Sequence, residues 1–170
     1  VLMAEQRGRQ VDVNQVVRAI SRGEYLSQLP RLSKRGLGRS VHCLVDRAAH
    51  LIPYWRDQQV MERVLGGFLA EGDYHSAVLI DGETEPRSWR NGESVPWCLP
   101  EPYSVVVILS DLGALAAYPA EYIERWQHLG RRLQQRHCHG VVLMPCEPCA
   151  SDRRLQSYFQ CIPWETRRYS

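Results

Sequence analysis

Several features are scarce or missing in this 170-residue sequence. It has no apolar run of about 18 residues, as a membrane-spanning helix requires, and no charged-then-apolar start of the kind that directs export. We therefore expect a cytoplasmic protein with no membrane partner. The sequence also lacks a phosphate-binding Gly-rich loop, a Ser-His-Asp order and a His-Glu-x-x-His helix, so it has none of the motifs that mark those nucleotide-binding or hydrolytic sites.

Lysine is nearly absent, since Lys34 is the single lysine among 21 basic residues. The formal net charge of +2 is too weak and too mixed to indicate nucleic-acid binding by itself. The basic residues gather near the N-terminus, where residues 1–40 hold eight Arg or Lys and three acids. Nucleic-acid binding through this segment is possible but not indicated.

The length and composition bound the organisation of the chain. Hydrophobic residues at 44% and charged residues at 24% are ordinary for one globular domain with a single core. Six cysteines without an export signal are expected to remain thiols. The chain begins on Val and stops without a clear end, so we expect a piece of a longer polypeptide.

Apolar runs alternate with amphipathic stretches along most of the chain. We expect strands at residues 41–46, 76–82, 103–111 and 140–145, and helices at 54–69 and 120–136. This alternation predicts an α/β fold, a three-layer sandwich with a mostly parallel sheet of four to five strands. Residues 83–102, rich in Pro, Trp and charge, are expected to form a long irregular connection.

The N-terminal part has a different pattern. Apolar residues recur at helical spacing over residues 11–29, and residues 32–39 look like a basic connector. We therefore expect a helical segment and basic linker over residues 1–39 and the α/β domain over residues 40–170.

The order of elements resembles a reduced von Willebrand factor A domain, which is Rossmann-like. In that family the first strand ends in an Asp-x-Ser-x-Ser metal motif and a later strand ends in Asp-Gly. The corresponding residues here are Asp46, Ala48 and His50, and Asp111 followed by Leu112. Both hydroxyl residues of the motif are replaced.

A second resemblance rests on residues 44–58 and 109–113. They are similar to an uncharacterised domain of large, multidomain bacterial proteins that carry a formylglycine-generating-enzyme-like module elsewhere. The likeness extends over roughly residues 29–148. It implies a companion or regulatory domain whose partners are other domains of the parent polypeptide or a separate protein.

Three expected strands end in Asp46, Asp81 and Asp111. The carboxyl ends of parallel strands share one edge of the sheet, where ligands bind in α/β proteins. Asp46 and Asp111 are favoured as caps of the turns that follow their strands. The alternatives are a Mg²⁺ site on Asp46 and Asp111 and, with Asp81 as a third acid, metal-dependent hydrolysis.

The sequence Cys146-Glu147-Pro148-Cys149 has the spacing of a zinc or redox pair. Further zinc ligands would come from residues 137–139 or from Cys161. Because the strand at 140–145 separates the first group from Cys146, we do not expect zinc to be held here. No thioredoxin-like pattern surrounds the pair. Five tryptophans are expected mainly in the core, with exposed interface positions as the alternative.

We expect a non-enzymatic, protein-binding or regulatory domain with no catalytic residue and no cofactor. The expected binding residues are Asp46, Arg47, His50, Asp81 and Asp111. The alternative is a nuclease-like, metal-dependent hydrolase that uses Asp46 and Asp111.

Overall fold

The computed structural model describes residues 7–24, 26, 30–33, 40–69, 72–150 and 152–164. Strands and helices alternate over most of this length, as βαβ units require. The main strands are β3 (Val41–Arg47), β4 (Tyr74–Ile80), β5 (Arg87–Arg90), β6 (Glu93–Pro96), β7 (Val105–Leu109), β8 (His139–Met144) and β9 (Phe159–Pro163). The main helices are α2 (Trp55–Phe68), α3 (Pro119–Gln135) and α4 (Arg153–Gln156), with the 3₁₀ segments η1 (Ala49–Tyr54) and η2 (Pro148–Ala150).

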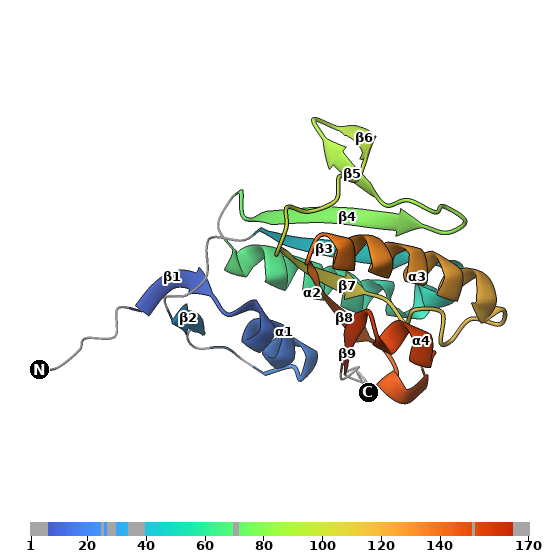
Figure 1. Ribbon diagram of the computed structural model, residues 1–170. Helices are drawn as coiled ribbons and strands as arrows, with labels where there is room; N and C mark the ends of the chain where they lie inside the picture. Colours follow the sequence, from blue (N-terminus) through green and yellow to red (C-terminus); the bar gives the residue numbers. More distant parts are fainter. Residues whose placement is uncertain are drawn as a thin grey trace, which may run out of the picture.

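The strands form one seven-stranded sheet in the order β6-β5-β4-β3-β7-β8-β9 (Figure 1). Five neighbouring strands are parallel, namely β4, β3, β7, β8 and β9. The other two, β5 and β6, are antiparallel additions at one edge. The α/β class and the parallel part of the sheet are confirmed. The predicted number of four to five strands is wrong, because the sheet is mixed and has seven.

The two extra strands form a hairpin within residues 83–102. Asn91 and Gly92 make its turn with φ of 52° and 82°, and Arg90 pairs with Glu93 across it. Asn-Gly is the preferred pair for such two-residue turns, because both positions need a positive φ. The prediction of an irregular connection is therefore wrong here, since the turn pair outweighs the surrounding Pro and charged residues.

Helices cover both faces of the sheet (Figure 1). Successive strand residues alternate between the faces. Leu44 packs with Trp126 of α3 on one face, while Cys43 packs with Met61 and Leu65 of α2 on the other. Among the described residues, no helix has both the length and the apolar character needed to cross a membrane.

The N-terminal helix α1 (Val13–Ser21) packs on the α2 face through Val16 and Val17. Its first turn is capped by Asp12, whose carboxylate accepts a hydrogen bond from the N–H of Gln15 at 3.1 Å. Gly23, with φ of 65°, follows its end. The helix is thus shorter than the predicted 11–29.

A short antiparallel pair, β1 (Arg7–Val11) and β2 (Arg31–Ser33), accompanies this helix and was not expected from the sequence. Tyr25 and Leu29 of the predicted helical face lie outside the described residues. So do residues 34–39 of the predicted basic connector.

Candidate functional site at the carboxyl rim of the sheet

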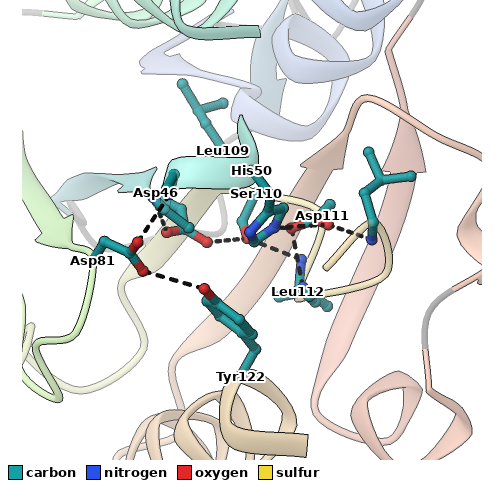
Figure 2. Close-up of polar contacts among 12 residues, drawn as sticks. Asp46, His50, Asp81, Leu109, Ser110, Asp111, Leu112 and Tyr122 are labelled. Atoms are coloured by element: carbon teal, nitrogen blue, oxygen red, sulfur yellow. Dashed lines mark hydrogen bonds and ion pairs between the residues drawn. The ribbon is translucent and has the colours of Figure 1, made fainter. Parts of the chain in front are cut away.

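Three carboxylates gather where three neighbouring parallel strands end. Asp46 is the next-to-last residue of β3, Asp81 follows β4, and Asp111 lies two residues beyond β7. Because the strand order is β4-β3-β7, the three side chains lie at one edge, which we call the carboxyl rim. Figure 2 shows them together with His50 and Tyr122.

Asp111 fastens two loops to the rim. Its side chain is completely buried, and its two oxygens accept hydrogen bonds from the N–H groups of Gly113 at 3.0 Å and Leu115 at 2.6 Å. The Nε2 atom of His50 lies 3.0 and 3.1 Å from the same two oxygens. We call residues 48–54 and 110–118 the rim loops, and Asp111 contacts both.

Asp46 is also completely buried. Its Oδ1 accepts a hydrogen bond from the N–H of Ala48 at 3.1 Å, and its Oδ2 accepts one from the hydroxyl of Ser110 at 2.6 Å. Burial raises the pKa of Asp46, while the Ser110 hydroxyl and the nearby Arg125 favour the ionised form and oppose that rise. Asp46 therefore connects the start of one rim loop to the start of the other.

Arg125 of α3 supplies a cation behind these acids. Its Nη2 lies 3.7 Å from Oδ1 of Asp46, and its Nη1 donates to the carbonyl of Glu83 at 3.2 Å. The guanidinium carbon is 5.0 Å from the ring centre of Tyr122 and 5.5 Å from that of Trp126. Ion-pairing and cation–π contacts together hold this side chain, which is only 10% exposed.

Asp81 is exposed at the same rim and joins the first rim loop to α3. Its carboxylate accepts a hydrogen bond from the N–H of Ala49 at 3.1 Å and from the hydroxyl of Tyr122 at 3.2 Å. The ring of Tyr122 also meets His50 edge-on, with 5.0 Å between centroids. Each of the three acids thus accepts hydrogen bonds from a rim loop.

Arg47 does not join the carboxylates. It follows Asp46 in β3 and therefore lies on the opposite face, where its Nη1 donates to Oε1 of Gln58 at 3.2 Å and its guanidinium lies over Trp55. The buried amide of Gln58 donates to the carbonyls of Asp46 at 2.9 Å and Leu109 at 3.0 Å. Gln58 thereby ties α2 to the ends of two strands.

The turn after β7 has an unusual backbone. Leu112 is buried with φ of 56°, a conformation that few residues other than glycine adopt. The next residue, Gly113, has φ of 85°, and a Cβ atom added there would lie 2.6 Å from Cβ of Tyr122. The Asp111 hydrogen bonds hold this strained turn against α3.

A cleft of about 860 Å³ lies beside the rim, between the β4–β5 loop and α3. Its lining is rich in acidic residues and also contains one tyrosine, one histidine and two arginines. The residues that line it include Asp81, Glu83, Glu121, Tyr122, Glu124 and Arg125.

Asp46 and Asp111 accept hydrogen bonds from backbone N–H groups of the turns that follow their strands, as capping carboxylates do. All four oxygens of these two side chains already accept hydrogen bonds from protein donors. Within the part of the chain that the structure describes, no group of three or more His, Cys, Asp or Glu is arranged to hold a metal ion.

The cysteine-rich segment is divided by β8. His139 opens this strand, whereas Cys146 lies beyond its last residue. Cys146 and Cys161 are partly buried against the α3-side core, and the side chain of Cys149 lies outside the described ones.

Some of the tryptophans lie in the core and one is exposed at the surface. Trp97, Trp126 and Trp164 are buried, whereas Trp89 on the β5–β6 hairpin is 53% exposed.

Sequence reasoning missed Ser110, Gln58, Tyr122 and Arg125. Ser110 directly precedes Asp111, and a hydroxyl beside a strand-end carboxylate was the one local signal available. The other three residues come from helices, and their contacts depend on how α2 and α3 cross the sheet.

No protein-family model matches this chain, and no curated protein sequence matches it.

Proposed function

We propose that this chain is a non-enzymatic α/β domain that binds a protein segment through its rim loops, as part of a larger bacterial polypeptide. The observation that carries the proposal is the set of hydrogen-bond partners of the two buried acids. Asp46 and Asp111 are directed at loop N–H groups, a hydroxyl and an imidazole, rather than at the solvent. Such carboxylates order loops, and ordered loops bind with a smaller entropy cost.

The rim loops present apolar side chains to solvent. Ile52 is 57% exposed, Leu115 is 42% exposed and Tyr118 is 84% exposed. Single exposed apolar residues are common on protein surfaces. Here they lie on two loops that Asp46 and Asp111 both connect. Tyr is enriched in the energetically important part of interfaces.

The resemblance to a degenerate von Willebrand A domain from multidomain bacterial proteins supports the same proposal. A companion domain needs a stable surface rather than a reactive group. Its partner is then another domain of the parent polypeptide or a separate protein.

Site-specific photocrosslinking in the parent protein tests the proposal. A photoreactive phenylalanine analogue replaces Tyr118 in one sample and Tyr103 in the other. Tyr103 is 52% exposed and precedes β7, at the opposite end of the sheet. We expect a discrete crosslink to one protein segment from position 118 and none from position 103.

The crosslink from position 118 must also be lost when Ile52 and Leu115 are both replaced by Asp. Equal crosslinking from both positions, or a crosslink that survives these replacements, would contradict the proposal.

A metal-dependent hydrolase remains the alternative function. Hydrolysis would require a metal ion on the carboxylates of Asp46 and Asp111, whose oxygens also accept hydrogen bonds from protein donors. The assay is cleavage of single- and double-stranded nucleic acid with Mg²⁺ or Mn²⁺. Cleavage that disappears in folded Asp46→Asn and Asp111→Asn variants would replace the binding proposal.

A further inference from the structure

A second polar cluster lies at the opposite, amino-terminal end of the sheet. His42 of β3 is 9% exposed, and its Nδ1 accepts a hydrogen bond from the indole N–H of Trp97 at 3.3 Å. Its Nε2 lies 3.2 Å from the hydroxyl oxygen of Ser40. The cluster shares no residue with the rim.

The chemistry of the indole fixes the protonation state of His42. An indole nitrogen can only donate a hydrogen bond, so Nδ1 must carry a lone pair. The single proton of the neutral ring is therefore on Nε2, which donates to Ser40. A proton added to His42 can only go to Nδ1, where it would face the indole N–H.

Trp97 also secures the β5–β6 hairpin. The hairpin has one residue pair in register with the rest of the sheet, Val78 with Arg87, and it projects away from the sheet in Figure 1. The backbone N–H of Trp97 donates to the carbonyl of Pro86 at 2.9 Å, which closes the base of the hairpin. The Trp97 side chain is buried in the α3-side core.

We infer that the Trp97–His42 contact is an acid-labile latch: protonation of His42 releases Trp97 and, with it, the base of the β5–β6 hairpin. The trigger is local, because the added proton removes the one acceptor of the Trp97 indole. A buried imidazolium next to an indole N–H is unfavourable.

Other charged and titratable groups surround His42. The adjacent cavity of about 640 Å³ is lined by Asp73, Tyr74, His75, Arg90, Cys98 and Glu101. The carboxylates of Asp73 and Glu101 favour protonation of His42, whereas Arg90 and a protonated His75 oppose it. The His75 ring stacks on His42 with 4.7 Å between centroids.

Burial, as the larger cause, and the neighbouring His75 lower the pKa of His42 from 6.5 to about 4. This lowered pKa determines how the stability of the folded protein changes with pH. The neutral form is favoured in the folded protein, so the contribution of His42 is complete above pH 6.5 and is lost as the pH falls through about 4.

Long-range proton–nitrogen NMR of the whole chain tests the latch. Spectra are recorded while the pH is lowered from about 7 to about 3.5, which spans the titration of a depressed histidine. We expect Nδ1 of His42 to be unprotonated at neutral pH and to titrate near pH 4. Amide hydrogen exchange at residues 87–96 should then rise at least ~10-fold above its intrinsic pH dependence, while β7 stays protected.

Two variants separate the latch from general acid sensitivity. Trp97→Phe keeps a ring but removes the indole donor, so the His42 titration should shift up by about one pH unit and hairpin exchange should no longer follow it. Trp89→Phe changes an exposed ring of the same hairpin and should leave both measurements unaltered.

The latch is overturned by any of three results. These are a proton on Nδ1 at neutral pH, a His42 titration near 6.5, or loss of protection in β7 and the hairpin at the same pH. The titration of the wild-type chain decides between these outcomes even if Trp97→Phe does not fold.

Discussion

His50 and Asp111 join two loops that are 61 residues apart in the chain, with His50 Nε2 lying 3.0 and 3.1 Å from the two carboxylate oxygens. The same carboxylate accepts hydrogen bonds from the N–H groups of Gly113 and Leu115. Asp111 therefore contacts both rim loops and accepts the hydrogen bonds of two backbone N–H groups in the second one.

Replacement of Asp111 by Asn should destabilise the protein. The Asn amide has nearly the same size as the carboxylate, but it has only one oxygen. Its NH₂ group must therefore face one of the two backbone N–H groups, of Gly113 or Leu115, that now donate to Asp111. We expect a loss of about 2–4 kcal/mol in the free energy of unfolding, measured with denaturant. Asp73→Asn, in the exposed turn before β4, is the control and should change it by less than ~0.5 kcal/mol. Equal effects of the two replacements would refute the role given to Asp111.

Replacement of Asp46 by Asn should have a distinct pH signature. Because burial raises the pKa of Asp46 above 3.8, its contribution to stability is complete below that value and is lost as the pH rises through the folded-state pKa. The Asn variant has no such loss. The stability of the variant relative to the wild type should therefore increase with pH, measured by denaturant unfolding at several pH values. A relative stability that falls with pH would show that ionised Asp46 is favoured in the folded state.

Gly113→Ala and Gly82→Ala form a matched pair. Both glycines have a positive φ, 85° and 78°, but a Cβ at position 82 meets no atom within 4 Å, whereas one at 113 would lie 2.6 Å from Cβ of Tyr122. We expect a loss of about 1 kcal/mol for Gly82→Ala from backbone strain alone. Gly113→Ala should lower the free energy of unfolding by about 2 kcal/mol more, because the turn at residue 113 and α3 must move apart. Thermal or denaturant unfolding of both variants measures the difference, and similar losses would rule out the close approach of Tyr122.

Gln58→Leu should show how α2 is held to the rim. The change leaves the buried carbonyls of Asp46 and Leu109 without the amide that now donates to both. We expect a loss of about 2–3 kcal/mol, measured by denaturant unfolding. Gln59→Leu, at an exposed position of the same helix, should cost less than ~0.5 kcal/mol. A small effect at position 58 would mean that other donors satisfy these carbonyls.

Some of this site could be predicted from the sequence. Hydrophobic runs that end in Asp46 and Asp111 indicate buried strands, and parallel strands bring their carboxyl ends to one edge. Asn91-Gly92 was an available hairpin signal, because both residues of the turn need a positive φ. The positions of these residues follow from local patterns.

The partners of the acids could not be found in the same way. Arg125 and Gln58 reach the rim from helices on opposite faces, and their reach depends on the packing of each helix on the sheet. The positive φ of Leu112 is equally unexpected, because leucine does not favour it and the Asp111 hydrogen bonds select it. These features depend on the tertiary structure rather than on local sequence.

Amide hydrogen exchange at Gly113 and Leu115 tests the central claim most directly. If the buried carboxylate of Asp111 orders the rim loops, both amides exchange at least ~100-fold more slowly than an open loop allows. In Asp111→Asn they lose this protection, while the amide of Ala48, held by Asp46, keeps it. Exchange at open-loop rates in the wild type, or protection that persists in Asp111→Asn, would contradict the account.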